Sequence, residues 1–410
     1  MIGPDARSLD PAKPPFTARQ WACIAAITAL AAALRLYGLG DWAFWVDEAH
    51  TWRDATLPAD IFWSCNRSWY PTSYVIVRWA LETAGPDAVS EGMLRLPFAL
   101  AGIVSVPLLA LVARTMAGAS AALLAATLLA IDPWHVYWSQ NARAYALVFL
   151  FALLAMGLCW SGARRRSLAT TCLAFAAALV GITCHPTAGF ALLPMVAFPL
   201  LRDRAWDARM VVALAALTGL SFLVVPFLAN VPPFHEFVLA KSTPDLSHFA
   251  QTVAFYFRLP VLLLAVVGAW SMWQESRKPT LYLCLWLALP LLALAVLGSS
   301  LVKATARYAY CALPAALVLA AVGCMRIRAA VDAAYADSGR WLRKLPGLAA
   351  ALLVCIDLLV YDFHYFTIQQ GDRGMWKQAA QQVLALEPEG KATVLTINEP
   401  TMQFLSLIHI

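Results

Sequence analysis

Long apolar runs separated by short polar or basic stretches recur from residue 20 to residue 362. Most of these runs approach the roughly 20 apolar residues that a helix needs to cross about 30 Å of hydrocarbon. They do not alternate between apolar and polar positions as the strands of a membrane β-barrel do; residues 119–131, for example, are mostly Ala and Leu. The pattern therefore predicts an all-α integral membrane protein with about eleven transmembrane helices.

The composition agrees with this fold class. Of the 410 residues, 61% are hydrophobic and only 13% are charged, whereas a soluble domain is about half apolar and about a quarter charged. A water-soluble fold is therefore excluded. The predicted spans are residues 20–38, 94–113, 118–137, 144–162, 168–184, 187–201, 210–229, 259–273, 280–298, 308–325 and 345–362.

Basic residues gather in the N-terminal tail and in the connections on the same side of the membrane. These segments hold 17 of the 30 Lys and Arg residues, and such a bias marks the cytoplasmic side. We therefore expect residues 1–19 to be a cytoplasmic tail and the chain to be a multi-pass protein of a bacterial inner membrane. The net charge of +6 is spread over many loops, so it indicates membrane lipids rather than a nucleic acid as the partner.

Two segments on the opposite, periplasmic side are unusually long. The first, residues 39–93, is rich in Trp, Phe and Tyr, which is typical of short helices at a membrane interface. The second, residues 229–258, begins with a polar, Pro-containing stretch and ends with aromatic residues. We interpret it as a lid or a further interfacial helix.

Residues 363–410 are expected to form a periplasmic C-terminal segment. The pattern predicts an amphipathic helix over residues 372–386 and a strand over residues 392–397, the opening of a small α/β domain. One helix and one strand cannot bury a core. We therefore expect this domain to be cut short at residue 410.

Asp47 and Glu48 form an acidic pair directly after the first predicted span. Adjacent side chains point in different directions on any regular element, so one carboxylate can face a reacting hydroxyl while the other orients a neighbour or holds a cation. The pair could equally be a solvated loop pair or a helix N-terminal cap. The spacing alone leaves these interpretations open.

Other polar residues lie at the outer ends of later spans, where charges near the bilayer are costly and mark functional candidates. Gln140 and Arg143 lie between the third and fourth spans. A guanidinium there could hold a phosphate with two hydrogen bonds, or could only extend to the lipid headgroups. His185 lies in an outer turn and could be no more than a polar turn residue.

Lys303, Arg307 and Tyr308 lie at the outer mouth of the tenth span. Cations on this side run against the positive-inside bias, so they indicate an anionic ligand. A general base and several cations together suit transfer from a phosphorylated donor to an acceptor hydroxyl. Since nucleoside triphosphates are absent outside the cytoplasm, a lipid phosphate is the expected carrier. The sequence contains no Walker glycine loop, dinucleotide fingerprint, zinc-type Cys/His spacing or nucleophilic Ser elbow.

Several short motifs follow one another along residues 20–362. They are Leu34-Arg-Leu-Tyr-Gly-Leu with Trp45-Val-Asp-Glu-Ala, then Arg95-Leu-Pro, Asp132-Pro-Trp-His-Val-Tyr-Trp-Ser-Gln-Asn-Ala-Arg-Ala-Tyr-Ala, Thr183-Cys-His-Pro-Thr-Ala-Gly and Ala306-Arg-Tyr. In order and spacing they resemble the membrane-embedded GT-C glycosyltransferases that use polyprenyl-phosphate sugars. The likeness is greatest to bacterial relatives of protein O-mannosyltransferase and of the aminoarabinose transferase that modifies lipid A.

The resemblance implies a GT-C transmembrane catalytic domain over residues 20–362, with the first span retained rather than cleaved as a signal peptide. It implies that Asp47 is the catalytic base with Glu48 beside it, and that the outer cations contact the lipid phosphate. The expected donor-binding residues are Gln140, Arg143, His185, Lys303, Arg307 and Tyr308.

Two motifs depart from the family pattern. Asn141 stands where members often have Glu, and Trp69-Tyr70-Pro71 stands where His-Pro-Pro is common. The second change removes a polar contact from the acceptor region. Adjacent carboxylates could hold a hard cation such as Mg²⁺ or Mn²⁺, but the sequence assigns no metal and no other cofactor.

The sequence thus predicts an inverting glycosyltransferase. It would move a sugar from a polyprenyl-phosphate donor to a hydroxyl of a lipid, glycan or protein acceptor on the periplasmic side. Two other classes remain open. A membrane polysaccharide polymerase or ligase would consume a diphosphate-linked glycan, and a lipid or solute transporter would place broken helices and ionisable residues at the midplane. A catalytically silent scaffold is the plainest alternative.

Overall fold

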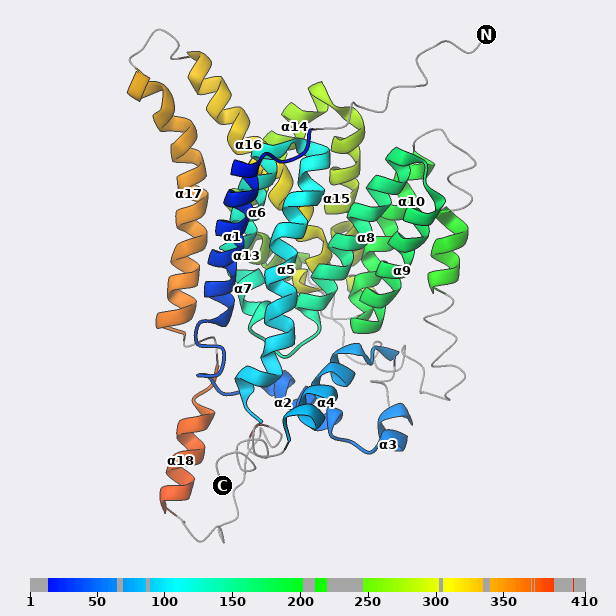
Figure 1. Cartoon of the computed structure of the whole chain (residues 1–410), viewed down its shortest axis with the longest axis vertical. Coiled ribbons are helices and arrows are strands. Elements are labelled where there is room, and N and C mark those ends of the chain that lie inside the picture. The colour runs from blue at the N-terminus through cyan, green and yellow to red at the C-terminus, as the bar shows by residue number, and fades with distance from the viewer. Residues whose placement is uncertain are drawn as a thin grey trace.

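A computed structural model describes residues 14–64, 69–85, 89–201, 211–219, 246–301, 305–334, 340–369, 371, 373–386 and 401. Within these ranges the chain is helical and contains no β-strand. Long helices lie roughly side by side in one bundle, and the short helices α2, α3 and α4 gather below one end of it (Figure 1). The first outer loop is therefore a helical cap on the bundle.

The helices of the first half are α1 (Ala18–Leu36), α2 (Val46–Ala55), α3 (Ala59–Ser64), α4 (Thr72–Ala84), α5 (Glu91–Ala117), α6 (Ala119–Ala130), α7 (Pro133–Ser139), α8 (Tyr145–Arg165), α9 (Leu168–Cys184) and α10 (Leu192–Leu200). Those of the second half are α13 (Leu246–Phe257), α14 (Leu259–Glu275), α15 (Arg277–Leu301), α16 (Leu313–Ala334), α17 (Arg340–Thr367) and α18 (Trp376–Leu386). The 3₁₀-helix η4 (Pro186–Ala191) precedes α10, and the 3₁₀-helix η5 (Ala306–Ala312) precedes α16.

Ordinary capping residues set the helix ends. The hydroxyl oxygens of Thr17, Ser90 and Ser167 accept hydrogen bonds from backbone N–H groups in the first turns of α1, α5 and α9. Gly118, with a φ of +87°, separates α5 from α6, a backbone conformation that few other residues adopt. The chain therefore reverses between these helices within one residue.

The predicted span over residues 118–137 is not one helix. Instead α6 and α7 meet at a bend of 58°. Pro133 cannot continue α6, and Asp132 begins α7 by accepting a hydrogen bond from the His135 N–H at 2.8 Å. Arg35 at the end of α1 donates to the carbonyl oxygens of Leu129 and Ala130 at 3.0 and 2.9 Å. The freed end of α6 is therefore capped by a side chain from α1.

The predicted count of eleven spans is not confirmed. Four described helical segments are long and apolar enough to cross a membrane, namely Glu91–Ala117, Tyr145–Arg165, Arg277–Val296 and Ala306–Ala334. The number rises to six if two bent pairs, α6 with α7 and α13 with α14, each form one span. Four other helices occupy further predicted spans but do not meet that criterion, namely α1, α9, α10 and α17. Of the predicted span 210–229, only residues 211–219 are described.

The segments outside the bundle differ in part from expectation. Helix α13 forms the end of the second outer segment, whose earlier residues lie outside the described part of the chain. Helix α18 begins at Trp376, four residues later than predicted. The predicted strand over residues 392–397 also lies outside the described residues, so the α/β domain is not confirmed.

Helices α14 and α16 cross in close backbone contact. A Cβ atom on Gly268 would lie 1.9 Å from the carbonyl oxygen of Leu319, and one on Gly323 would lie 2.1 Å from that of Leu264. Small residues allow such approach between membrane helices, where packing rather than the hydrophobic effect drives association.

We expect Gly268→Ala to destabilise the fold by about 1–3 kcal/mol, because the added methyl group must push two backbones apart. Gly189→Ala is the matched control, since the nearest atom to its added methyl group belongs to Ile182 at 3.9 Å. The thermal unfolding midpoint in detergent measures both. Equal midpoints for the two variants would contradict the close crossing.

Candidate active site

Helix α2 carries the acidic pair in its first turn. Trp45 is the N-cap residue, and its backbone N–H donates to Glu48 Oε2 at 3.0 Å. Acidic residues are favoured in this position because they interact with the unpaired N–H groups of the helix start. A helix N-terminal cap was one of the interpretations of the acidic pair, and Glu48 makes this cap. Asp47, the preceding residue, points in another direction.

Glu48 is fully buried and forms an ion pair with Arg95 of α5, which is also fully buried. Arg95 Nε and Nη2 donate to the two carboxylate oxygens of Glu48 at 2.8 and 2.9 Å. The remaining guanidinium donors of Arg95 bind the carbonyl oxygens of Leu39, Trp42 and Ala43, each at 3.0 Å. One side chain of the bundle therefore holds both the acidic helix and the turn that leads into it.

Two further groups bind the carboxylate of Glu48. The backbone N–H of Ala142 donates to Oε1 at 2.8 Å, and Arg373 Nε lies 3.2 Å from Oε2. Burial alone would raise the pKa of Glu48, but the guanidinium groups of Arg95 and Arg373 outweigh it and lower the pKa to about 2. Glu48 is therefore an ionised structural anchor, with no oxygen left to accept a substrate proton.

Asp47 remains accessible beside this anchor. Its side chain is 35% exposed, and Oδ2 lies 3.9 Å from Arg143 Nη2. Arg143 Nη1 also donates to the Asp47 carbonyl oxygen at 3.3 Å and to Thr51 Oγ1 at 2.9 Å. The predicted acid and the predicted cation therefore come from different elements and meet at the start of α2.

Aromatic side chains surround Arg143. Tyr70, Tyr74 and Tyr145 lie near its guanidinium group. The ring centroids of Tyr70 and Tyr145 lie 5.5 and 5.4 Å from that of His185. His185 Nδ1 accepts from the Thr187 N–H at 3.3 Å, so His185 caps η4 as a polar turn residue. It thus lies in the wall around Arg143.

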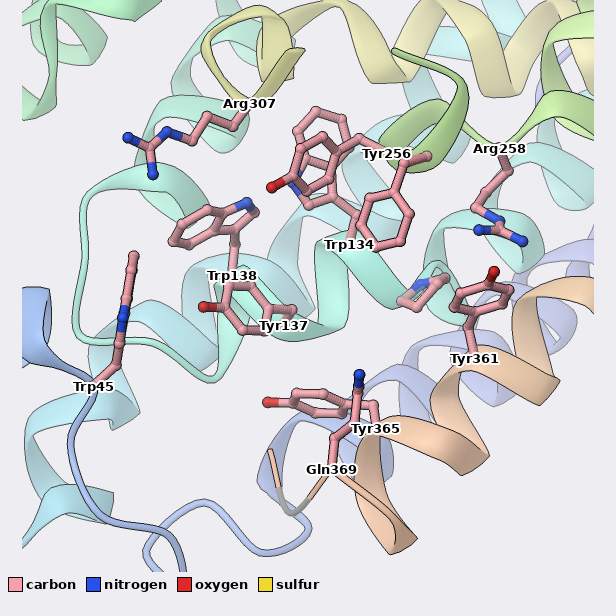
Figure 2. A pocket seen from close by; sticks show the side chains of 12 residues that line it. Trp45, Trp134, Tyr137, Trp138, Tyr256, Arg258, Arg307, Tyr361, Tyr365 and Gln369 are labelled. Atoms are coloured by element: carbon pink, nitrogen blue, oxygen red, sulfur yellow. The ribbon is translucent and has the colours of Figure 1, made fainter. Parts of the chain in front are cut away.

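A cavity of about 290 Å³ lies next to this cluster (Figure 2). Its walls are largely aromatic, and Figure 2 shows two guanidinium groups at opposite ends of it, those of Arg307 and Arg258. Its lining residues are Trp45, Pro133, Trp134, Tyr137, Trp138, Phe255, Tyr256, Arg258, Arg307, Tyr361, Tyr365 and Gln369. Trp45 precedes Asp47 by two residues, so the acidic helix starts at the wall of the cavity.

The two cations of the cavity are held differently. Arg258 donates to both carboxylate oxygens of Asp357 at 3.0 and 2.8 Å, so its charge is neutralised within the protein. Among the described residues, Arg307 donates a hydrogen bond to Tyr308 Oη at 3.0 Å, its guanidinium carbon lies 5.0 Å from the Tyr308 ring centroid, and Asp47 lies within electrostatic range of it. Arg307 therefore offers more unbalanced positive charge to a ligand than Arg258 does.

The remaining predicted donor-site residues are placed differently. Gln140 is buried and donates to the Leu34, Arg35 and Tyr37 carbonyl oxygens at 3.2, 3.3 and 2.6 Å. Its Oε1 accepts from Tyr365 at 3.0 Å. It closes the end of α1 rather than lining the cavity. Lys303 lies outside the described residues.

Several residues of this region were not predicted from the sequence. Tyr365 and Arg373 both follow the last predicted span, and Arg258 lies at the bend between α13 and α14. Arg258 has a φ of +60°, an uncommon conformation for a residue with a side chain. The one available signal for Arg258 was a cation at an outer span end, which is the criterion that singled out Arg143.

The acidic pair does not form a two-carboxylate metal site. Each Glu48 oxygen already accepts from an Arg and a backbone N–H group, so only Asp47 remains available to a cation. Among the described residues, no group of three or more His, Cys, Asp and Glu side chains is arranged to hold a metal ion.

We expect Glu48→Gln to destabilise the protein by about 3–5 kcal/mol, because two buried guanidinium groups would lose their anion. The folded-state pKa lies below the ordinary value of 4.5, so this stabilisation is complete above about pH 4.5 and disappears as the pH falls toward about 2. Thermal midpoints in detergent between about pH 7 and pH 3 test both statements.

Glu275→Gln is the matched control, since Glu275 is 57% exposed and its ion pair with Arg326 should contribute less than about 1 kcal/mol. A Glu48→Gln midpoint equal to that of the control at neutral pH would contradict the anchor.

Comparisons with known proteins agree with the fold and with part of the sequence. The family model for dolichyl-phosphate-mannose-protein mannosyltransferase matches residues 87–229. A search of curated protein sequences gave no significant match.

Solved structures share the fold, among them ArnT and AglB. ArnT from Cupriavidus metallidurans, bound to undecaprenyl phosphate, aligns with a TM-score of 0.60 and 17% identity over 96% of this chain and 76% of its own. The oligosaccharyltransferase AglB from Archaeoglobus fulgidus, in complex with an inhibitory peptide and a dolichol phosphate, aligns with a TM-score of 0.60 and 13% identity over 91% of this chain and 59% of its own. The chain is a membrane protein with the GT-C glycosyltransferase fold, and residues 87–229 match the mannosyltransferase family.

Proposed function

We propose that the protein is an inverting glycosyltransferase that takes a sugar from a polyprenyl-phosphate donor. The observation that carries this proposal is the accessible carboxylate of Asp47, held on a buried anchor and surrounded by Arg143 and Arg307 beside an aromatic cavity. The family match and the shared fold with ArnT and AglB, both bound to a polyprenyl phosphate, support it.

Asp47 acts as the general base in this mechanism. It accepts the proton of an acceptor hydroxyl while the hydroxyl oxygen attacks the anomeric carbon of the donor sugar. The bond from that carbon to the phosphate oxygen breaks with its electron pair, so the lipid phosphate leaves and the anomeric configuration inverts. A positioned general base of this kind contributes roughly 10²- to 10⁴-fold.

Arg307 and Arg143 stabilise the charge that grows on the leaving phosphate. Arg307 lines the cavity, and both residues lie within electrostatic range of the Asp47 side chain. Because little bulk water reaches a partly buried site, fixed cations there stabilise a developing anion more than they would in water. Lys303 and Tyr308 remain candidates for the same phosphate.

The cavity fits the sugar and the first part of the lipid. The ring centroid of Trp134 lies 4.8 Å from that of Tyr256 and 4.5 Å from that of Tyr310. Such rings offer flat apolar faces to a sugar or to isoprene units and leave polar edges for hydroxyls. A lipid, glycan or protein acceptor would enter from the open side of Asp47.

We infer that the site faces the periplasm of a bacterial inner membrane. The acidic helix and α18 lie at one end of the bundle in Figure 1. Helix α8 ends in Arg164 and Arg165, and α15 begins with Arg277 and Lys278. Basic connections of this kind mark the cytoplasmic side, which supports a cytoplasmic N-terminus and an outward-facing site.

A lipid or solute transporter is the second candidate. It is favoured by the two bent helix pairs, at 58° and 83°, because transporters bind substrates at broken helices. A transporter would move its substrate without releasing free polyprenyl phosphate, so the assay below separates the two functions.

We expect Asp47→Asn to reduce release of polyprenyl phosphate from a panel of polyprenyl-phosphate sugars roughly 10²- to 10⁴-fold. Thermal stability should stay unchanged, because the Glu48 anchor is intact. Purified protein in nanodiscs with a crude acceptor extract provides the measurement. Asp60→Asn is the control, since Asp60 is exposed in α3 of the same outer loop. Full activity in Asp47→Asn would contradict the proposed base.

We expect Arg307→Gln to lower kcat/KM for the donor roughly ten- to a hundredfold, which corresponds to the loss of about 1.5–3 kcal/mol from a hydrogen bond to a charged group. Arg326→Gln, whose ion pair with Glu275 lies outside the site, is the matched control. Steady-state kinetics on the donor identified above measure both. An Arg307→Gln value equal to that of the control would remove Arg307 from the donor site.

A further inference from the structure

The chain that follows α17 turns back onto the first outer loop. Tyr365, near the end of α17, donates to Gln140 Oε1 at 3.0 Å, and its ring centroid lies 5.7 Å from that of Trp42. Beyond the helix, Lys377 Nζ lies 3.0 Å from Glu91 Oε1 and donates to the Gly40 carbonyl oxygen at 2.9 Å. The described residues 365–369, 371 and 373–377, here called the return segment, therefore contact the first outer loop before Trp42, at Gly40, and after it, at Glu91.

Gly371 allows this approach. It has a φ of +73°, and a Cβ atom there would lie 2.4 Å from the Trp42 ring. An L-residue would both clash with the ring and adopt a strained backbone. The return segment thus lies against Trp42 through a position that only glycine fits.

Arg373 carries the return segment into the buried charge network. It is 8% exposed, and its Nε lies 3.2 Å from Glu48 Oε2, on a carboxylate that Arg95 already holds through two hydrogen bonds. Although burial alone would lower the pKa of Arg373, the negative charge of Glu48 raises it. Arg373 is therefore a permanent second cation on the anchor.

Arg373 also contacts the turn that carries Arg143. Its Nη2 donates to the Gln140 carbonyl oxygen at 3.5 Å, its Nη1 donates to the Gly371 carbonyl oxygen at 2.8 Å, and its guanidinium carbon lies 5.0 Å from the Tyr137 ring centroid. Glu48 in turn accepts from Ala142 of the same turn. One side chain therefore connects the helix of Asp47 to the turn of Arg143.

We propose that Arg373, which follows α17, is a positioning residue. It fixes the separation between Asp47 and Arg143. This proposal rests on the proposed transferase function. Arg95 alone can hold Glu48 on α5, but it has no hydrogen bond to residues 140–144 among the described contacts. The Glu48–Ala142 hydrogen bond already joins α2 to this turn, and Arg373 supplies a second connection through the Gln140 carbonyl oxygen, so the return segment contributes to the geometry of the active site.

The test compares Arg373→Gln, Arg373→Lys and Gly371→Ala with the control Arg326→Gln in nanodiscs. We expect Arg373→Gln to lower kcat roughly a hundredfold with a small change in donor KM, because a misplacement of about 1 Å has an effect of that size. Arg373→Lys should recover part of the loss because it restores the charge without the planar fork. Gly371→Ala should lower kcat without removing any charged group.

Hydrogen exchange supplies a readout that is independent of turnover. In Arg373→Gln we expect faster amide exchange at residues 45–49 and 141–144 together, with unchanged exchange in α14 and α16. In Arg373→Ala, added guanidinium at millimolar concentration should restore part of kcat, whereas it should not restore Asp47→Asn.

Wild-type kcat in Arg373→Gln, or exchange that is unchanged in both segments, would overturn the proposal. Loss of kcat with a folding defect across the whole bundle and no recovery by Arg373→Lys or guanidinium would also overturn it, because the role would then be purely structural. Undiminished turnover in Asp47→Asn would refute the proposed function itself and is a separate result.

Discussion

The buried ion pair between Glu48 and Arg95 is the interaction on which the rest of the site depends. Two charges with side chains at most 1% exposed are stable in an apolar interior only when they neutralise each other and their hydrogen bonds are complete. Both conditions are met here through the loop carbonyl oxygens and the Trp45 and Ala142 N–H groups. The pair therefore holds three parts of the chain against α5. They are α2, the turn that precedes it, and the turn that contains Ala142.

The same pair explains how two adjacent acids have different roles. Successive side chains on a helix point roughly 100° apart, so the direction that buries Glu48 turns Asp47 outward. Asp47 then gains a defined position without giving up its own oxygens to the protein. A cation on the open side, Arg143, lies close enough to orient the carboxylate and yet leaves it 35% exposed.

Much of the fold could be predicted from the sequence, because apolar run length and charge bias report directly on membrane helices. The break at Asp132 was missed although Pro133 was visible, since the apolar run continues across it and hydropathy does not register a bend of 58°. The motif that contains this break was read as a site motif. In the structure Asp132 starts α7, and Arg35 of α1 caps the end of α6.

The site was predicted less completely, for a different physical reason. Asp47, Arg143 and Arg307 could be chosen as candidates because charges at outer span ends are costly and therefore informative, and the structure brings these three together. The assignments of Gln140 as a donor ligand and of Glu48 as a catalytic partner depended on residue type, which does not show which atoms the protein already uses. Arg373 lies more than 300 residues from Glu48 along the chain, and only the return of the segment after α17 brings them together.

An experimental structure of the Asp47→Asn variant with a bound polyprenyl-phosphate sugar would test the arrangement most directly. We predict that the phosphate lies within hydrogen-bond distance of Arg307, with the anomeric carbon facing residue 47 and Glu48 still paired with Arg95. A phosphate bound away from Arg307, or an anomeric carbon on the far side of the cavity from residue 47, would contradict a base held on this anchor.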